Sequence, residues 1–552
     1  MKILWLDINS SYSHSSVALP AIHAQVAHVE SWEWCVVRGT INDSPGAIAA
    51  AVAEHKPDLI AATFWLFTHQ MQIEILSRAV QLLDGVKVIC GGPEFLGNNE
   101  EFLRHHPFVT AVLRGEGEIA FPMWLENLDN IEDWDLIQGL CYINPEDGSY
   151  HDEGIARVAE FASLKYPDES EFFRWDKPFV QLETTRGCFN TCAFCVSGGE
   201  KPIRSQSLEQ VAARLENIHA HGIKDIRVLD RTFNYDTARA LDMLSLFEQY
   251  AGEMRFHLEI HPSLLSEQLK EKLATLPAGL LHLEAGIQSL DINVLEECGR
   301  RGSLSRSIEG LTFLASLTNV EVHADLIAGL PLYTLEMLAE DVVRLVEIGV
   351  DELQIESLKV LPGTQMRRKA QEKGLKYSPL PPYEILSTSA MIPHDIRRAM
   401  HISRMVDFYY NSAPWQDITR TLILMVDGFL LDFTRYLEEI MVLDSPLSLE
   451  RRGVILYEYC QAHCPDFTDD VSFAWIRGGF SLKKGPAGNV RKLKDVDGYI
   501  AERDAQMIVI NGSPDPSLKY YLFTASDGQY VFGYTTEAHH SAPVFCGVLI
   551  NP

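Results

Sequence analysis

The stretch ETTRGCFNTCAFCVSGG, residues 183–199, carries the most specific motif of this chain. Its cysteines, Cys188, Cys192 and Cys195, follow the spacing C-x-x-x-C-x-x-C. Thiolates this close together converge on one soft metal centre. The apolar run FVQL, residues 179–182, comes just before them and predicts a buried strand. The motif is therefore expected at the carboxyl end of a strand, where α/β folds keep their chemistry.

The number of thiols separates two kinds of metal site. A structural zinc site needs four protein ligands, whereas this loop offers three, and the nearest histidines, His151 and His219, lie far outside it. Three thiolates on a cubane iron–sulfur cluster leave one iron without a protein ligand and open to a small chelating molecule. A zinc site or a disulfide pair is the simpler alternative, and the missing fourth ligand disfavours it.

The composition of the 552-residue chain is that of a globular protein with an acidic balance of charge. Apolar residues make up 46%, so disorder is not expected, and the length allows two to four domains. The formal charge is −29, from 47 basic and 76 acidic residues. A chain this acidic repels polyphosphate backbones, so general nucleic-acid binding is not expected.

The sequence also predicts a cytoplasmic location. The amino terminus MKILWLDINSSY lacks the long apolar core of a signal peptide. The longest apolar candidate, residues 422–433, is interrupted by Asp427 and Asp432, so no membrane span is expected. The ten cysteines are scattered rather than arranged as a disulfide framework, which favours a reducing compartment.

Residues 1–140 alternate short apolar strands with helical patterns. The predicted strands are Lys2–Ile8, Glu33–Val37, Leu59–Phe64, Lys87–Cys90 and Ala111–Leu113, and the predicted helices include Pro45–Glu54 and Met71–Leu83. This alternation predicts a parallel, doubly wound, Rossmann-like (flavodoxin-like) sheet whose ligand crevice lies outside the carboxyl ends of its strands. The loops at those ends are rich in glycine or hydroxyl groups: Asn9-Ser10-Ser11, Gly91-Gly92-Pro93-Glu94 and Arg114-Gly115-Glu116-Gly117-Glu118. Ordinary turn chemistry is the simpler explanation for each loop taken alone.

A linker at residues 141–175 leads into a second strand–helix repeat, and a short hairpin is expected at Leu140–Ile143. Six strands are predicted between residues 176 and 375: Phe179–Glu183, Asp225–Leu229, Phe256–Ile260, Leu281–Ala285, Val320–Ile327 and Glu352–Leu358. Helical patterns fill the gaps, so six β/α units predict a partial barrel of six parallel strands. Its strand ends carry polar residues, as barrel chemistry requires, among them Asp230, Asn234, Glu259, Glu284, Gln288 and Asp325.

Residues 376–552 predict a separate domain, first helical and then α+β. The predicted helices are Glu384–Tyr410, Trp415–Met441 and Glu450–Cys460, followed by a hairpin of Tyr520–Ala525 with Tyr530–Thr535 and a strand at Val544–Ile550. Cys460 and Cys464 could form a further metal site with distant ligands such as His539 and His540. Two cysteines four residues apart on a helix more often simply face the same way.

The cysteine loop, with aromatic Phe194 before its third cysteine, resembles that of the radical S-adenosylmethionine (SAM) enzymes. The resemblance implies a [4Fe–4S] cluster whose open iron chelates the methionine moiety of SAM, and reductive cleavage to a 5′-deoxyadenosyl radical. Carried over to this chain, it implies Glu284 or Glu259 at the ribose and Arg300, or else Arg301, at the methionine carboxylate. It also implies contacts from Gln288, from the backbone around Phe194 to the adenine edge, and from the turn Gly329-Leu330-Pro331 to the adenine.

One segment departs from the family pattern. Gly198-Gly199-Glu200 is similar to the family's amino-group-binding signature, but that signature normally follows the second strand, where this chain has Asp230–Asn234. We interpret Gly198-Gly199 as loop flexibility. We expect the backbone and side chains of Asp230–Asn234 to meet the methionine amino group.

The loops of the first domain, taken as a set, resemble the cobalamin-binding domain found ahead of the radical SAM barrel in one large subgroup. The resemblance implies that Ser10, Gly91, Gly92, Gly115, Glu116 and Gly117 line the face that receives the corrin. The D-x-H-x-x-G pattern of cobalamin mutases is absent, so neither His14 nor His69 is expected as a lower ligand of cobalt. The carboxyl-terminal region, most clearly residues 383–411, resembles an uncharacterised domain of the same subgroup.

These resemblances imply a cobalamin-dependent radical SAM methyltransferase acting on a small-molecule or peptide substrate, with a reductant such as flavodoxin or ferredoxin. Residues 376–552 would cap the barrel and help to select the substrate. One alternative is the same radical chemistry used for ring formation or rearrangement. The alternative from a different class is a non-enzymatic iron–sulfur carrier or sensor, which would not need a nucleoside pocket.

Overall fold

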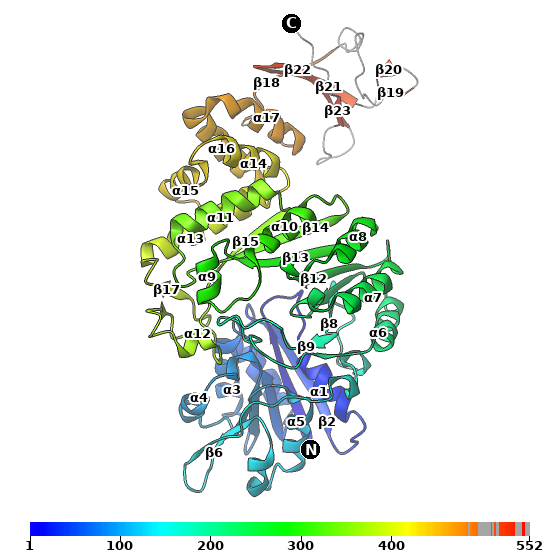
Figure 1. Ribbon diagram of the computed structural model, residues 1–552. Helices are drawn as coiled ribbons and strands as arrows, with labels where there is room; N and C mark the ends of the chain where they lie inside the picture. The colour runs from blue at the N-terminus through cyan, green and yellow to red at the C-terminus, as the bar shows by residue number, and fades with distance from the viewer. Residues whose placement is uncertain (484–485, 495–508, 511–512, 515–517, 536–543, 547–552) are drawn as a thin grey trace. The chain divides into compact units, whose positions relative to one another are not determined.

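Figure 1 shows the computed structural model of the chain, which describes residues 1–483, 486–494, 509–510, 513–514, 518–535 and 544–546. It divides into two compact units, and each is treated by itself. The first unit contains Met1–Leu335 and Glu356–Ile396, and the second contains Glu336–Ile355 and Arg397–Pro552.

The first sheet has seven strands in the order β2-β1-β3-β4-β5-β6-β7. Its strands are β1 (Lys2–Asn9), β2 (Glu33–Thr40), β3 (Leu59–Thr63), β4 (Lys87–Gly91), β5 (Ala111–Leu113), β6 (Leu140–Ile143) and β7 (Tyr150–Asp152). Strands β1 to β5 are parallel, while β6 and β7 are antiparallel. The doubly wound, flavodoxin-like prediction is confirmed, since the order 2-1-3-4-5 places a switch point between β1 and β3.

Helices cover both faces of this sheet because its strands are apolar at consecutive positions. In β1, Leu4 and Leu6 pack with α2 (Pro45–Glu54) and α3 (His69–Ala79) in one core. Ile3 and Trp5 pack on the other face, with residues of α1 (Ala18–Val26) and α5 (Gly117–Glu126). A strand buried on both faces reads as a continuous apolar run, which is the pattern seen in the sequence.

The segment expected as a linker extends the first sheet. The predicted hairpin at Leu140–Ile143 forms, and β6 pairs with β5 while β7 pairs with β6. The chain then runs past the loop after β5, where Gly115 and Ala156 form a parallel β-bridge. Residues 140–156 therefore pack as part of this layer.

Gly115 is a position where the backbone demands glycine. Its φ is +107°, and a Cβ there would collide with the carbonyl oxygen of Ala156 and lie 2.9 Å from its nitrogen. Gly115→Ala is therefore expected to destabilise the protein by about 3 kcal/mol, from a positive φ together with a forced backbone shift.

Urea unfolding of the full chain, followed by intrinsic fluorescence, would measure this loss. Gly85→Ala is the matched control, because Gly85 also has a positive φ, +69°, but a Cβ there would meet nothing within 4 Å. It should cost only about 1 kcal/mol. Equal losses for the two variants would show that close packing around Gly115 does not matter.

The second sheet has six strands in the order β15-β14-β13-β12-β11-β8. They are β8 (Phe179–Leu182), β11 (Asp225–Val228), β12 (Arg255–Ile260), β13 (Leu281–Gln288), β14 (Val320–Ala328) and β15 (Glu352–Ser357). The helices between them are α6 (Leu208–Ala220), α7 (Thr237–Glu248), α8 (Glu267–Thr275), α9 (Ile292–Glu297), α10 (Leu304–Ala315) and α11 (Leu335–Ile348). The prediction of six β/α units is confirmed.

Burial alternates along the strands of this sheet. In β12, Phe256, Leu258 and Ile260 are buried, whereas His257 and Glu259 are partly accessible on the opposite face. The same alternation runs through β13 and β14. One face of the sheet is therefore apolar, and the other presents ionisable groups.

The carboxyl-terminal part is helical and then β-rich, as predicted. Its helices are α13 (Pro393–Met405), α14 (Gln416–Met425), α15 (Phe429–Glu439), α16 (Leu449–His463) and α17 (Thr468–Arg477). The antiparallel sheet β18-β21-β22-β23 follows, with β18 (Asn489–Lys492), β21 (Leu518–Ala525), β22 (Gly528–Thr535) and β23 (Val544–Cys546). Among the described residues, no helix is both long enough and apolar enough to cross a membrane.

Two helix predictions in this part were wrong in extent. The predicted helix Trp415–Met441 is two helices, because Gly428 adopts a left-handed conformation with φ +70° between them. The helix predicted from Glu384 begins at Pro393, since Ile385–Ser387 instead pairs as a strand with Lys376–Tyr377. Residues 547–550 of the last predicted strand lie outside the described residues.

Candidate functional site

The cysteine motif occupies the loop of a short hairpin. Strand β9 (Thr185–Arg186) pairs antiparallel with β10 (Arg204–Ser205), and the three cysteines lie between them. The Cys188 N–H donates to the Glu200 carbonyl at 3.0 Å and thus closes the loop near its base. A Cβ on Gly198 would collide with the Cys192 carbonyl oxygen. Gly198 is therefore required by close packing, and the interpretation of this glycine as a source of flexibility was wrong.

Hydrogen bonds clamp the cysteine loop to the segment after α9. The Asn190 side chain donates to the Arg301 carbonyl at 2.9 Å and accepts from the Arg301 N–H at 2.8 Å. The Thr191 hydroxyl donates to the Gly299 carbonyl at 2.8 Å, and the Ala193 N–H donates to the Cys298 carbonyl at 2.7 Å. The cysteines are thus held on a rigid loop beside the end of β13.

The environment of the sulfur atoms suits thiolate ligands. The Asn190 N–H donates to the Cys188 sulfur at 3.4 Å, and the Thr232 hydroxyl lies 3.8 Å from the same sulfur. Arg300 donates to the Cys192 sulfur at 3.6 Å. Burial raises the pKa of Cys192, and the neighbouring Arg300 opposes that rise. Three neighbouring thiols, two of them with donors at their sulfurs, fit an iron–sulfur cluster, whose properties depend on such hydrogen bonds.

Two predicted SAM ligands meet next to these cysteines. Arg300 also donates to the Gly286 carbonyl on β13. A Cβ placed on Gly286 would lie 2.6 Å from the Gln288 amide nitrogen and 3.7 Å from the Arg300 guanidinium. Arg300, Gln288 and Cys192 are therefore brought together, whereas the side chain of Arg301, the alternative to Arg300, is exposed.

The predicted ribose ligands are neighbours across two strands. Glu259 on β12 and Glu284 on β13 are register partners, and Asp325 on β14 pairs with Gly286, two residues beyond Glu284. Glu284 lies 2.8 Å from His257, and this hydrogen bond lowers the pKa of Glu284. Burial raises the pKa of Asp325 to about 6 and that of Glu259 to about 7. The strand ends thus carry one carboxyl whose pKa is lowered and two whose pKa values are raised.

The raised pKa of Glu259 predicts that the stability of the protein depends on pH. Burial raises this pKa from 4.5 to about 7, so between these values the folded protein retains a proton that the unfolded chain releases. Stability therefore falls as the pH rises through that window. Glu259→Gln has no titrating group at this position. The free energy of unfolding of the variant minus that of wild type is therefore expected to rise by about 2 kcal/mol between pH 4.5 and pH 8.

Urea unfolding of the cofactor-free protein at several pH values between 4.5 and 8 would test this. A stability difference between Glu259→Gln and wild type that does not change with pH would show that Glu259 titrates normally.

Two residues predicted near the methionine amino group have partners in the backbone. Asp230 is buried and accepts hydrogen bonds from the N–H groups of Thr184 and Thr185, both at 2.8 Å, and from the Thr184 hydroxyl at 2.5 Å. The Asn234 side chain donates to the His261 carbonyl and accepts from its N–H. Both side chains hold neighbouring strand ends together, and their contact with SAM stays a prediction.

The residues predicted at the adenine lie in two places. Phe194 is half-buried, and the carbonyl of the preceding Ala193 accepts from the Met366 N–H at 2.7 Å, which positions that part of the loop. Gly329 has φ +83°, and a Cβ there would lie 2.6 Å from Ile385. Pro331 is buried. This turn is therefore closely packed against protein, and its contact with adenine stays a prediction.

Two cavities lie at the carboxyl ends of the first sheet. The larger, about 310 Å³, is lined on one side by Gly92, Gly115, Glu116 and Gly117. On the other side it is lined by residues in and beside the cysteine loop: Glu183, Thr185, Arg186, Gly187, Val196, Ser197 and Glu200. The smaller, about 140 Å³, is lined by Gly91, Gly92 and apolar side chains that include Trp5, Ile89, Leu113 and Phe121. Five of the six predicted corrin-facing residues therefore line these cavities. Ser10, in the loop after β1, lines neither of the two.

The histidines that follow strands of the first sheet both have protein partners. The ring of His69 lies 2.8 Å from Glu94, whose carboxylate also accepts from the Tyr383 hydroxyl at 2.9 Å. The ring of His14 lies 2.6 Å from the Ser11 hydroxyl. That neither histidine ligates cobalt stays a prediction. His539 and His540, possible partners of the buried Cys460 and Cys464, lie outside the described residues.

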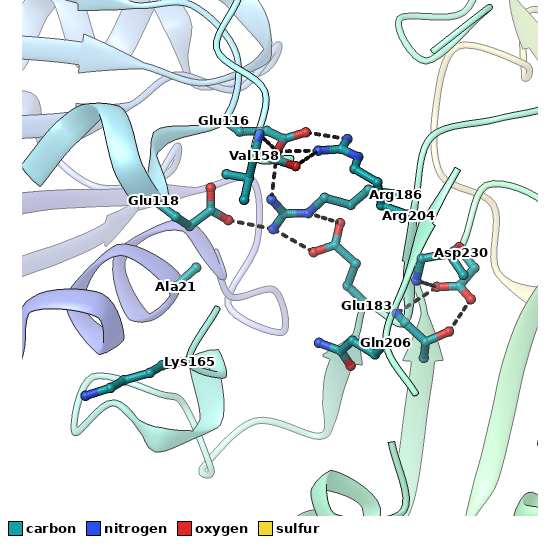
Figure 2. A network of polar contacts seen from close by, with 12 residues as sticks. Ala21, Glu116, Glu118, Val158, Lys165, Glu183, Arg186, Arg204, Gln206 and Asp230 are labelled. Atoms are coloured by element: carbon teal, nitrogen blue, oxygen red, sulfur yellow. Dashed lines mark hydrogen bonds and ion pairs between the residues drawn. The ribbon is translucent and has the colours of Figure 1, made fainter. Parts of the chain in front are cut away.

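Sequence reasoning missed an ionic network beside the cysteine loop (Figure 2). Arg186, two residues before Cys188, forms ion pairs with Glu116, Glu118 and Glu183 at 3.2, 2.5 and 2.9 Å. Arg204 joins the network through Glu116 at 2.7 Å. The sequence shows only an arginine before the cysteines and two glutamates, Glu116 and Glu118, in the RGEGE segment. Nothing in the sequence indicates that they meet.

Comparison with protein families gives three matches. Residues 182–345 match the family described as Radical SAM superfamily, and residues 6–124 match the B12 binding domain. Residues 371–474 match a protein family of unknown function, DUF4080. The radical SAM range contains the cysteine loop and strands β11 to β14. The B12-binding range contains strands β2 to β5 and their glycine loops.

Individual relatives agree with these matches. The chain is 26% identical over 374 residues to the uncharacterized methyltransferase PH0819 of Pyrococcus horikoshii, covering 64% of this chain and 80% of that one. It is 22% identical over 344 residues to the cobalamin-dependent radical SAM methyltransferase TokK of Streptomyces tokunonensis, covering 59% of this chain but only 50% of TokK.

Among solved structures, the cobalamin-dependent SAM radical enzyme OxsB, with aqua-cobalamin and SAM bound, superposes with a TM-score of 0.58 at 14% identity. The superposition covers 86% of this chain and 78% of OxsB. At this level of identity the likeness establishes the fold.

Proposed function

Because the chain belongs to the radical SAM superfamily and carries a B12-binding domain ahead of its barrel, we propose that it is a cobalamin-dependent methyltransferase. Its substrate would be a small molecule or a peptide. The observation that carries the proposal is the cavity of about 310 Å³, which has the glycine loops of the B12-binding domain on one side and the cysteine loop on the other. A methyl carrier and a SAM-cleaving centre need to face a common space if both act on one substrate.

The residues in and beside the cysteine loop have separate tasks in the proposal. Cys188, Cys192 and Cys195 hold the cluster, which supplies the electron for SAM cleavage, while the corrin carries the methyl group. Arg300 takes the methionine carboxylate as a two-point fork, and Gln288 with Glu259 or Glu284 binds the nucleoside. The smaller apolar cavity, with Trp5 and Phe121 in its wall, suits the flat aromatic base of the cobalamin tail.

The partners follow from the same chemistry. SAM cleavage consumes an electron, so the protein needs a small reductant such as flavodoxin or ferredoxin. A cluster with an open iron is sensitive to oxygen, which supports a reducing cytoplasm as the location of the protein. Residues 376–552 would select the substrate. They include most of the range that matches DUF4080, residues 371–474.

The test uses anaerobically reconstituted protein loaded with hydroxocobalamin, a strong reductant and SAM carrying a deuterated methyl group. We expect both 5′-deoxyadenosine and S-adenosylhomocysteine, together with a deuterated methyl group on one component of a cell extract. 5′-Deoxyadenosine without S-adenosylhomocysteine would favour the ring-forming or rearranging alternative. Neither product, with an intact cluster, would favour an electron carrier or sensor.

A further inference from the structure

The loop that carries the three cysteines is closed at its base by two facing arginines. Arg186 and Arg204, both labelled in Figure 2, are register partners in the hairpin of β9 and β10. Residues 187–203 form the loop between them. Like charges placed directly opposite each other on paired strands are destabilising. A carboxylate that contacts both arginines would remove this repulsion and hold the two ends of the loop together.

Glu116 provides that carboxylate, from a different part of the fold. One of its oxygens accepts from Arg204 at 2.9 Å and from Arg186 at 3.2 Å, and the other accepts from Arg204 at 2.7 Å. The Val158 N–H donates to the first oxygen at 2.7 Å. Although burial opposes it, the hydrogen bond from Arg204 and the charge of Arg186 lower the pKa of Glu116, so the carboxylate stays ionised.

Each remaining carboxylate of the network reaches only one of these two arginines, although Glu200 also pairs with Arg157 at 3.4 Å. Glu118 and Glu183 pair with Arg186, and Glu200 pairs with Arg204. Among the described residues, Glu116 is the carboxylate whose ion pairs reach both arginines. Its removal would leave each arginine with a local partner but would remove the link across the base of the loop.

The backbone holds Glu116 in this position. Gly115 before it forms a bridge with Ala156, and the Glu116 N–H donates to the Ala156 carbonyl at 3.1 Å. Gly117 after it begins α5. Gly115, Glu116 and Gly117 all line the cavity assigned above to the corrin, so a ligand seated there would rest on the peptides that orient this carboxylate.

We propose that Glu116 is a positioning residue that couples the corrin-facing loop to the closure of the cysteine loop, so that cobalamin binding and cluster retention stabilise each other. Coupling of this kind is reciprocal, because both ligands favour the same arrangement of one contact. The inference rests on the two cofactor sites of the proposed function but does not depend on methyl transfer.

The test measures how fast a chelator removes iron from the reconstituted protein, with and without hydroxocobalamin. For wild type, we expect hydroxocobalamin to slow iron release. For Glu116→Gln, we expect release to be about tenfold faster, the effect of ~1.4 kcal/mol, and insensitive to hydroxocobalamin. Glu100→Gln is the matched control, since Glu100 forms an exposed ion pair with Arg104 in the same domain and should behave as wild type.

A second variant keeps the test decisive if Glu116→Gln folds poorly. Arg204→Gln breaks the same contact from the other strand and leaves the corrin-facing loop unaltered, so it should also abolish the effect of hydroxocobalamin. If Glu116 acts through Arg204, the double variant should release iron no faster than the faster single variant. Wild-type release rates in both single variants, or hydroxocobalamin protection that persists in them, would overturn the proposal. Neither readout requires turnover, so a failure of methyl transfer would not affect the result.

Discussion

Cys192→Ala is expected to lower 5′-deoxyadenosine formation to the level without enzyme and to abolish binding of the cluster. Cys192 is 6% exposed and lies on a loop clamped by hydrogen bonds, so its loss leaves this loop with two thiols. A cluster bound by three cysteines cannot lose one and keep the geometry that leaves a single iron open. Iron and sulfide content after anaerobic reconstitution, together with the spectrum of the reduced protein, would measure the loss.

Cys298→Ala is the matched control for this result. Cys298 is fully buried and adjoins the same loop, but its hydrogen bond to the loop comes from its backbone carbonyl. Removing its sulfur should lower stability by about 1 kcal/mol and leave the iron content unchanged. Wild-type iron content in Cys192→Ala, or loss of iron in Cys298→Ala, would contradict the assignment of the ligands.

Arg300→Gln is expected to weaken SAM binding by about 30- to 100-fold while the iron content stays near that of wild type. A bidentate pair between a guanidinium and a carboxylate contributes about 2–3 kcal/mol, and a neutral amide retains little of it. The position of the guanidinium, between the Cys192 sulfur and the end of β13, is what supports this role. Equilibrium dialysis of the cluster-loaded protein against labelled SAM would measure the change in affinity.

Arg301→Gln provides the comparison, because the Arg301 side chain is exposed and its contacts to Asn190 come from the backbone. The substitution leaves those contacts in place and should change SAM affinity less than twofold. A larger effect from Arg301 than from Arg300 would move the carboxylate contact to Arg301.

The parts of the fold that the sequence predicts are those specified by local patterns. Strands such as Ala111–Leu113 and helices such as Pro45–Glu54 have the predicted bounds, because short apolar runs and a proline at the first helical turn leave few alternatives. The cysteine motif was equally readable, since its specificity lies in spacing alone. The cavity between the glycine loops and the cysteine loop agrees with the two resemblances taken together.

Contacts between distant parts of the chain were not readable in the same way. Glu116 and Arg186 are 70 residues apart in the sequence. No local pattern indicates that a carboxylate in a loop of the first sheet pairs with an arginine beside the second sheet. Asp230 shows a related limit. The sequence places a carboxylate at a strand end, but only the fold shows that both of its oxygens accept hydrogen bonds from the Thr184–Thr185 segment. A position at a strand end does not by itself distinguish a carboxylate that binds a ligand from one that holds two backbone segments together.

The antiparallel strands β6 and β7 bear on how the B12-binding half of this protein can be produced by itself. A fragment that ends at residue 140 would expose β5 as an open sheet edge, which is a template for aggregation. It would also lack Ala156, whose bridge holds the Gly115 loop. A fragment that extends through Val158 keeps both strands and the bridge, and is therefore the smallest piece suited to expression and to cobalamin titration without the oxygen-sensitive half.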